Sequence, residues 1–162
     1  MGLNIRVGQG FDVHPFADKR RLVLGGIEIP YERGLAGHSD ADVLIHAICD
    51  ALLGAAGLND IGAHFPDSDP HYKNSDSRLF LEQAINQLRQ RGWAVGNVDC
   101  TIIAQEPKIA PHVAAMKAVL SQLLCICEDD INIKATTTER LGFTGRKEGI
   151  AAQAVALITR IR

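Results

Sequence analysis

Three residues in the first third of the chain could together bind one transition-metal ion: Asp12, His14 and His46. Side chains two apart in an extended backbone project to the same side, so Asp12 and His14 can reach one ion. Two imidazoles and a carboxylate suit zinc and leave one coordination position open for chemistry. Spacing alone nevertheless favours the plainer interpretation, a surface Asp-Val-His segment and an unrelated helical histidine.

His46 belongs to a predicted helix near residues 40–56. Ser39 lies three residues before Asp42, as in a capping box, so we expect Ser39 to begin the helix. Asp42, His46 and Asp50 follow one another at i, i+4 spacing on a face separate from the apolar stripe. Either aspartate could accept the second ring N–H of His46 and fix its tautomer.

The start of the same helix offers a second kind of site. His38 and Ser39 precede it, and the unpaired N–H groups and positive dipole end of a helix can seat a phosphate. A diphosphate could lie there beside the metal. A capped helix with a solvent-facing histidine explains the same residues equally well.

A third group of polar residues, within 134–146, begins at the end of a predicted strand and continues into a turn that contains glycine. Its hydroxyls and backbone N–H groups could bind phosphate oxygens, Glu139 could hold a hard cation such as magnesium, and Arg146 could pair with an anion. The segment lacks the glycine and lysine pattern of a Walker loop, which argues against an ATPase. Threonines are also ordinary strand residues, so no single one of them indicates a site.

Two further segments are polar and rich in turns. Residues 60–69 carry carboxylates that could accept ribose hydroxyls or order a mobile lid, although a solvated loop explains them nearly as well. Residues 104–110 follow the end of a strand, and their exposed backbone could surround a planar nucleobase; by composition they are only a loop. The chain has no Gly-x-Ser-x-Gly elbow and no Gly-x-Gly-x-x-Gly dinucleotide turn, which argues against hydrolase triads and nicotinamide chemistry.

Hydrophobic periodicity predicts an α/β order of elements for these segments. The expected strands lie near residues 3–7, 21–29, 97–105, 131–136 and 149–160, and the expected helices near 40–56, 76–91 and 111–125. No repeat, low-complexity tract or linker interrupts the 162 residues. We therefore expect residues 1–162 to form a single domain.

Composition limits the partners of such a domain. A formal net charge of −2 provides no basic field for nucleic acid or an anionic membrane. The N-terminus lacks the pattern of a signal peptide, and no apolar run approaches a membrane span, so we expect a cytoplasmic or organellar-matrix protein. The four cysteines, which lack the spacing of structural zinc sites, are expected to be buried reduced thiols: Cys49, Cys100, Cys125 and Cys127.

Taken together, the motifs resemble those of the 2-C-methyl-D-erythritol 2,4-cyclodiphosphate synthases, from Arg6 nearly to the C-terminus. Each motif is modest alone, and their order and spacing together are specific. They are Gly10-Phe11-Asp12-Val13-His14, His38-Ser39-Asp40, Asp50-Ala51-Leu52-Leu53-Gly54, Asp60-Ile61-Gly62, Phe65-Pro66-Asp67, Ala104-Gln105, Pro107-Lys108, Lys134-Ala135-Thr136-Thr137-Thr138-Glu139 and Gly142-Phe143-Thr144-Gly145-Arg146.

The resemblance implies a cyclisation that consumes 4-diphosphocytidyl-2-C-methyl-D-erythritol 2-phosphate and releases CMP. It implies one zinc ion per subunit, held by Asp12, His14 and His46, and a magnesium or manganese ion held with the substrate diphosphate by Glu139. Two residues are implied to stabilise the transition state: His38 and Thr137.

The resemblance also implies a set of substrate contacts. Ser39 would lie beside the diphosphate, and Asp60 and Gly62 would hold the ribose. The erythritol phosphate would face residues 65–69, among them Phe65, Asp67 and Asp69. The cytosine would be enclosed by Ala104, Pro107, Lys108, Ile109, Ala110, Thr136 and Thr137, and the remaining contacts would come from Thr138, Phe143 and Arg146.

The implied fold is a single-domain two-layer sandwich, with a mixed sheet and helices on one face, assembling as a homotrimer. Active sites would lie between adjacent subunits, with Phe143, Arg146 and Glu148 toward the central axis. Departures from the family pattern are mild: Gln9 replaces a histidine of some relatives, and the pair Ile109-Ala110 is less bulky than usual. Two alternatives remain, a metal-dependent phosphodiesterase and a non-enzymatic trimer that binds nucleotide or metal.

Overall fold

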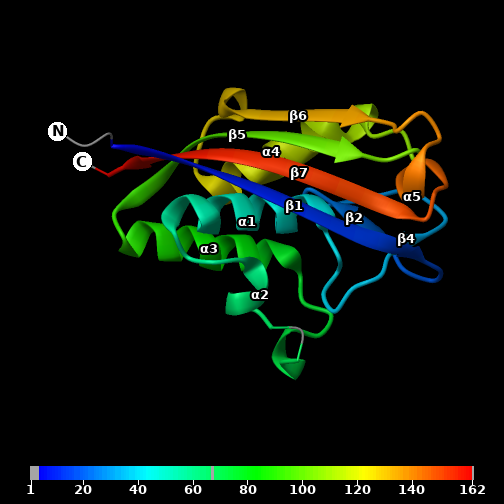
Figure 1. The fold of residues 1–162 in the computed structure, drawn as a ribbon, viewed down its shortest axis with the longest axis horizontal. Helices are drawn as coiled ribbons and strands as arrows, with labels where there is room; N and C mark the ends of the chain where they lie inside the picture. The colour runs from blue at the N-terminus through cyan, green and yellow to red at the C-terminus, as the bar shows by residue number, and fades with distance from the viewer. Residues whose placement is uncertain (1–3, 67, 162) are drawn as a thin grey trace.

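The computed structural model describes residues 4–66 and 68–161, which form a five-stranded mixed sheet with helices (Figure 1). The strand order is β4-β1-β7-β5-β6. Strands β5 and β6 pair in parallel, whereas the other neighbours are antiparallel. The strands are β1 (Ile5–Ala17), β4 (Gly34–Leu35), β5 (Trp93–Ile103), β6 (Ile131–Thr136) and β7 (Gly149–Arg160).

Three long helices accompany the sheet, and α1 and α3 lie together on one side of it (Figure 1). They are α1 (Val43–Ala56), α3 (Ser77–Gln90) and α4 (Val113–Leu124). The smaller elements are the β2 (Leu22–Leu24) and β3 (Ile27–Ile29) hairpin, the short helices α2 (Ile61–His64) and α5 (Gly142–Gly145), and 3₁₀ turns at Pro70–Tyr72, Ala110–His112 and Glu128–Asp130.

Helix α1 approaches β1 closely because two glycines face it. A Cβ on Gly8 would lie 1.9 Å from the carbonyl oxygen of Ala51, and one on Gly10 would lie 2.0 Å from that of Ala47. Alternate residues of a strand share a face, so Asp12 and His14 continue the same row. The glycines thus bring the helix that carries His46 against the strand that carries the other two candidate ligands.

The opposite face of β1 and β7 is exposed within one chain and mostly apolar, with Gln9 and Gln153 as polar members. Side chains there alternate with the buried row that faces the helices. Monomeric proteins rarely expose so many large apolar side chains on one face of a sheet. The exposed apolar members are Ile5, Val7, Phe11, Val13 and Val155.

The start of α1 is fixed by Asp42, not by Ser39. The Asp42 side chain accepts a hydrogen bond from the Ile45 N–H at 3.0 Å and those of Gly25 and Gly26 at 2.9 and 2.7 Å. Gly25 and Gly26 have positive φ and form the two-residue turn between β2 and β3, where a side chain would be strained. Asp42 is fully buried, so the expected separate polar face of α1 is wrong at this position.

The other expected elements are mostly confirmed. The mixed sheet with helices on one face is present, and the bounds of β6 and β7 match the prediction. Strand β1 is much longer than residues 3–7 and continues to Ala17, and residues 21–29 fold as a hairpin instead of one strand. The short edge strand and the short helices were not predicted from the sequence.

Cys49 and Cys100 are buried free thiols, as expected, whereas Cys125 and Cys127 are exposed, so that part of the cysteine prediction is wrong. Cys125 ends α4 in a left-handed conformation and Cys127 precedes a 3₁₀ turn, which places both outside the core. Within the part of the chain that the structure describes, no helix is long and apolar enough to cross a membrane.

Candidate metal centre and neighbouring clefts

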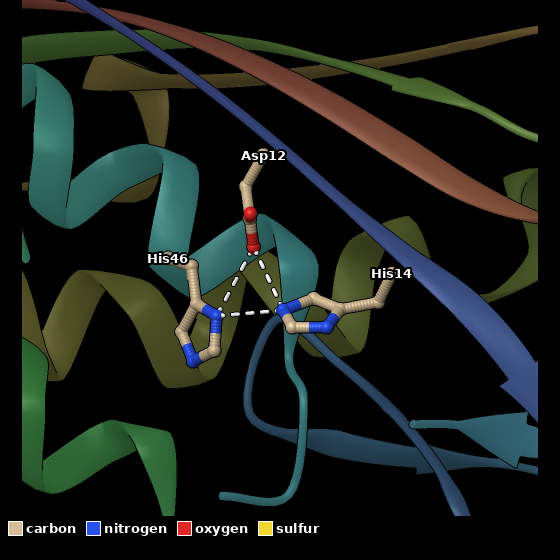
Figure 2. Close-up of side chains that lie close together, drawn as sticks. All are labelled: Asp12, His14 and His46. Atoms are coloured by element: carbon tan, nitrogen blue, oxygen red, sulfur yellow. Dashed lines mark hydrogen bonds and ion pairs between the residues drawn. The ribbon is translucent and has the colours of Figure 1, made fainter. Parts of the chain in front are cut away.

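Asp12, His14 and His46 converge at the contact between β1 and α1 (Figure 2). His14 Nε2 lies 3.0 Å from Asp12 Oδ2, His46 Nδ1 lies 3.1 Å from the same oxygen, and the two nitrogens are 3.1 Å apart. Tetrahedral zinc with bonds of about 2.0–2.1 Å separates its ligand atoms by roughly 3.3 Å. The triangle therefore has nearly the edge length that a zinc site requires.

The second nitrogen of each imidazole has a partner outside the triangle. His14 Nδ1 donates to the carbonyl oxygen of Ala36 at 2.7 Å, and His46 Nε2 lies 2.9 Å from Ser77 Oγ. A ring that is protonated on its outer nitrogen presents a lone pair on its inner nitrogen. Two lone pairs and a carboxylate then face one another, and a divalent cation satisfies all three.

The second partner of His46 differs from the one expected. Asp42 is held by three backbone N–H groups, and Asp50 accepts the N–H of Ile61 at 2.7 Å. Neither aspartate reaches the ring, so that prediction is wrong. Ser77, from the first turn of α3, takes this place and is fully buried.

Electrostatics keep Asp12 ionised. Partial burial by itself would raise the pKa of Asp12, but when the two imidazoles carry protons on the nitrogens that face it, hydrogen bonds from His14 and His46 together with their charge outweigh burial and hold the pKa well below its ordinary value. An ionised carboxylate is the form that binds a metal. The site thus meets the chemical requirements of a zinc centre in ligand type, spacing and charge.

The triangle opens into a cleft of about 220 Å³. Its walls combine the three candidate ligands with polar residues of the loop before α1 and apolar side chains of α2 and α3. The cleft is lined by Asp12, His14, Gly37, His38, Ser39, His46, Ile61, Gly62, Phe65, Tyr72 and Phe80. Of the expected site residues, His38, Ser39, Gly62 and Phe65 therefore lie beside the candidate metal centre.

The expected phosphate seat at the N-terminus of α1 already holds a carboxyl group. The buried side chain of Asp42 caps this end by accepting the N–H of Ile45, and its ionised form disfavours a second anion there. His38 remains beside the cleft, where its Nε2 donates to the carbonyl oxygen of Asp69 at 3.1 Å. Asp69 itself caps the following 3₁₀ turn, and Asp60 caps α2. Asp67 lies outside the described residues.

A second cleft lies at the carboxyl ends of β5 and β6. It is lined by Ala104, Gln105, Pro107, Lys108, Ile109, Ala110, Ala135, Thr136 and Thr137. These include every residue expected to enclose the cytosine. The two clefts share no lining residue, so one chain does not bring the base segment and the candidate metal ligands into a single pocket.

The remaining expected residues lie on the loop after β6. Thr137 Oγ1 approaches a carboxylate oxygen of Glu139 at 3.4 Å, and Thr138 Oγ1 donates to the carbonyl oxygen of Leu141 at 2.5 Å. Arg146 pairs with Glu148 at 2.9 Å, and Phe143 is partly exposed. Glu139 is not among the three residues that converge as candidate metal ligands in the described part of the chain, and its role as a second cation ligand stays a prediction.

Comparison with known proteins decides the family. The model of the YgbB family matches residues 5–159, almost the whole chain. The chain belongs to the YgbB family. Among curated YgbB-family relatives, the 2-C-methyl-D-erythritol 2,4-cyclodiphosphate synthase of Thiobacillus denitrificans is 64% identical over 156 residues, which cover 96% of this chain and 98% of that protein. The synthase of Halalkalibacterium halodurans is 62% identical over 156 residues, covering 96% of this chain and 99% of that protein.

Solved structures agree with the YgbB assignment. The CDP complex of IspF from Plasmodium falciparum aligns with a TM-score of 0.86 at 34% identity and covers 100% of both chains. The bifunctional IspDF of Campylobacter jejuni aligns with a TM-score of 0.95 at 44% identity, covering 99% of this chain and 43% of that longer one. The fold is therefore shared with CDP-binding relatives.

Sequence reasoning missed several residues of this YgbB-family site. Tyr72 and Phe80 form the apolar wall of the metal cleft, and Ser77 is the partner of His46. Phe80 belongs to an ordinary amphipathic stripe, and nothing in its spacing distinguishes it from core. Ser77 follows Asp76 at a helix start and has the signature of a capping residue, not of a ligand partner.

Proposed function

We propose that this chain converts 4-diphosphocytidyl-2-C-methyl-D-erythritol 2-phosphate into 2-C-methyl-D-erythritol 2,4-cyclodiphosphate and CMP, in the non-mevalonate route to isoprenoids. It is a cyclising phosphorus–oxygen lyase. The observation that carries this proposal is the convergence of Asp12, His14 and His46 in a chain 64% identical to a synthase of that name. The proposal treats residues 1–162 as one catalytic domain and places the reaction in the cytoplasm.

The reaction requires that the 2-phosphate be aligned with the β-phosphorus and that the negative charge of the phosphates be neutralised. An oxygen of the 2-phosphate attacks the β-phosphorus, the bond to the bridging oxygen breaks, and CMP leaves with the electron pair. Because the attacking oxygen is already anionic, no general base is required. The protein must hold the flexible substrate so that the two phosphates meet.

Zinc fits the ligand set, and magnesium or manganese fits Glu139. When bound, such cations supply positive charge that offsets the diphosphate, which a chain of net charge −2 cannot do alone. Asp12, His14 and His46 would hold the zinc ion. A single exposed carboxylate such as Glu139 suits a hard cation that keeps its waters and arrives with the substrate phosphates.

The remaining residues bind and orient. His38 and Ser39 line the metal cleft, where the imidazole and hydroxyl can donate to phosphate oxygens, while Asp60 and Gly62, at the start of α2, would bind the ribose. Phe65 and Asp69 would face the erythritol phosphate, and Asp67 is assigned with them by sequence alone. Thr137, on the second cleft, would stabilise the transition state together with His38.

The second cleft is the proposed cytidine pocket. Backbone groups of residues 104–110 and the hydroxyls of Thr136 and Thr137 can read the edge of a base without any charged side chain. Thr138, Phe143 and Arg146 would add contacts from the adjoining loop. CDP in the complex of the Plasmodium falciparum relative supports a cytidine nucleotide as the ligand.

A homotrimer would complete each site. One strand, β7, lies between the metal-binding strand β1 and strand β5, whose carboxyl end leads into the base segment at residues 104–110, so the two clefts of one chain are roughly 10 Å or more apart. A subunit interface could bring the metal cleft of one chain to the base cleft of its neighbour. The exposed apolar face of β1 and β7, with Phe11 and Val155, supplies surface for that interface.

Phosphorus NMR tests the proposed reaction. Purified protein with zinc, magnesium and the pathway substrate should release CMP and form a cyclic diphosphate, and Asp12→Asn should abolish turnover. The matched control is Asp129→Asn, at an exposed 3₁₀ turn, which should leave the rate unchanged. Two open monophosphates would indicate a phosphodiesterase instead, and CDP binding without turnover would indicate a non-enzymatic binding module.

A further inference from the structure

Beside the candidate metal centre, a carboxylate and a hydroxyl form a chain that ends on His46. Asp40 lies in the loop before α1, and Ser77 is the first residue of α3. We infer that Asp40 and Ser77 are positioning residues that keep the proton of the His46 ring on Nε2 and so keep Nδ1 open for the metal. The inference deepens the proposed function and rests on its metal site.

Asp40 uses both carboxylate oxygens on Ser77. Asp40 Oδ2 accepts the backbone N–H of Ser77 at 3.1 Å, and Asp40 Oδ1 accepts the Ser77 hydroxyl in a short hydrogen bond. A carboxylate can only accept, and a serine hydroxyl has one hydrogen. The hydrogen of Ser77 is therefore committed to Asp40.

This commitment decides what Ser77 can offer to His46. With its hydrogen directed at Asp40, Ser77 Oγ can only accept, so His46 Nε2, at 2.9 Å, must carry the proton and donate it. Neutral imidazole has one proton, and Nδ1, which faces Asp12 and His14, is then left with its lone pair. The direction of one hydrogen bond thus selects the tautomer that can bind a cation.

A second hydroxyl near the ring is less favourably placed. Ser39 Oγ lies 3.3 Å from His46 Nε2 and 3.4 Å from Ser77 Oγ, and it accepts the N–H of Ala41 at 3.1 Å. It has no carboxylate to direct its hydrogen. Ser39 can act as a weaker second acceptor, whereas Ser77 is both closer and fixed in its hydrogen-bond direction.

The surroundings keep this chain in place. Ser77 is fully buried, and the His46 ring packs against Phe80, with centroids 6.1 Å apart. The backbone N–H of Asp40 donates to the carbonyl oxygen of Ser75 at 3.0 Å, which ties the loop before α1 to the start of α3. Little freedom remains for the ring to turn its other nitrogen toward the metal.

Two substitutions separate this role from simple packing. Ser77→Ala removes the acceptor. Asp40→Asn keeps the shape but brings an amide N–H₂ that can donate to Ser77 Oγ, which frees the Ser77 hydroxyl to donate to Nε2 and moves the ring proton to Nδ1. Loss of such a partner typically weakens metal binding by about 10–100-fold, and we expect zinc affinity to fall in that range for both variants.

Matched controls test whether any change at these elements has the same effect. Asp76→Asn makes the same chemical change at the adjacent N-cap of α3, where asparagine also caps, and Ser121→Ala makes the same truncation on α4. Zinc affinity should stay within about twofold in both, since neither residue contacts a metal ligand. Circular dichroism and thermal unfolding monitor folding of every variant.

The tautomer itself can be read without activity. Nitrogen-15 histidine NMR of the full unsubstituted chain, recorded without zinc at alkaline pH so that the imidazoles are neutral, should show His46 protonated on Nε2, and Asp40→Asn should raise the Nδ1–H form. The visible spectrum of bound cobalt(II) should also change in Ser77→Ala and Asp40→Asn but not in the controls. The NMR result on the unsubstituted chain remains decisive even if Ser77→Ala does not fold.

Failure of this inference is distinguishable from failure of the proposed function. If the unsubstituted chain binds no zinc, the proposed metal site is wrong. If it binds zinc but shows His46 protonated on Nδ1, or if folded Ser77→Ala and Asp40→Asn bind zinc as tightly as the controls, the assignment of Asp40 and Ser77 is overturned.

Discussion

Replacing Gly10 by alanine should damage the candidate metal centre without touching any of its ligands. The new Cβ would lie 2.0 Å from the carbonyl oxygen of Ala47 and 2.8 Å from the backbone nitrogen of Ala51. Non-bonded carbon needs about 3.5 Å from its neighbours, so α1 must retreat from β1 by roughly 1 Å or more. Both close atoms are backbone, and no side-chain rotation relieves the clash.

This displacement of α1 should lower two measurable quantities, the affinity for zinc and the thermal stability. His46 lies on α1 and Asp12 on β1, with 3.1 Å between their ligand atoms, and metal–ligand distances tolerate only about 0.2 Å. Zinc affinity should therefore fall by at least about tenfold, the loss typical of disturbed ligand orientation. Overpacking costs about 1–3 kcal/mol, which at roughly 2–4 °C per kcal/mol lowers Tm by roughly 2–12 °C for a chain of this size.

Zinc titration and thermal unfolding of Gly10→Ala measure both effects, with Gly54→Ala as the matched control. Gly54 lies in α1, and the nearest atom to its added Cβ is the carbonyl oxygen of Gln9 at 4.0 Å. Alanine there should leave zinc binding unchanged and raise stability slightly, because it favours the helix. If Gly10→Ala binds zinc and unfolds like the unsubstituted protein, the close contact between α1 and β1 does not set the site.

Three further predictions concern other parts of the molecule. His46→Ala should abolish turnover in the CMP-release assay and lower stability by about 0.5–1.5 kcal/mol, because it removes the hydrogen bond from the ring to the buried Ser77 oxygen, which keeps its bond to Asp40; unchanged turnover would exclude His46 as a ligand. Burial raises the pKa of Asp42 to about 6 against the opposing hydrogen bonds of Ile45 and Gly26. Since the pKa of Asp42 in the folded protein exceeds the unfolded value of 3.8, the contribution of this carboxyl to the free energy of unfolding is greatest below about pH 4 and falls by roughly 3 kcal/mol as pH rises through 6. Urea unfolding from pH 4 to 7 should show this decrease in the unsubstituted protein and not in Asp42→Asn. Phe11→Glu, on the exposed face of β1, should convert a trimer of the 17.5 kDa chain into monomers in light scattering, and an unchanged mass would refute the proposed interface.

The sequence predicts the sheet strands where their pattern is unambiguous. β7 is an apolar run with two polar interruptions, and β6 has a buried–exposed alternation, so the bounds of both match. β1 is longer than predicted because Gly8 and Gly10 look like turn residues, whereas here they allow close contact with α1. Local propensity favours a turn at glycine, and tertiary packing overrides it.

The ligand set was predictable, and its surroundings were not. Strand alternation is enough to place Asp12 and His14 on one side, and the helix supplies His46. The partner of His46 comes from α3, more than thirty residues away, and no local pattern links Ser77 to that ring. Ser39 and Asp42 both have capping chemistry, and only burial against Gly25 and Gly26 selects Asp42.

X-ray absorption at the zinc edge of the loaded protein tests the central claim most directly. We expect one zinc ion per chain with nitrogen and oxygen ligands at about 2.0–2.1 Å and the outer-shell scattering of two imidazoles. A sulfur shell at about 2.3 Å would instead place the ion at cysteines such as the exposed Cys125 and Cys127. That result, or the absence of stoichiometric zinc, would contradict a metal centre formed by Asp12, His14 and His46.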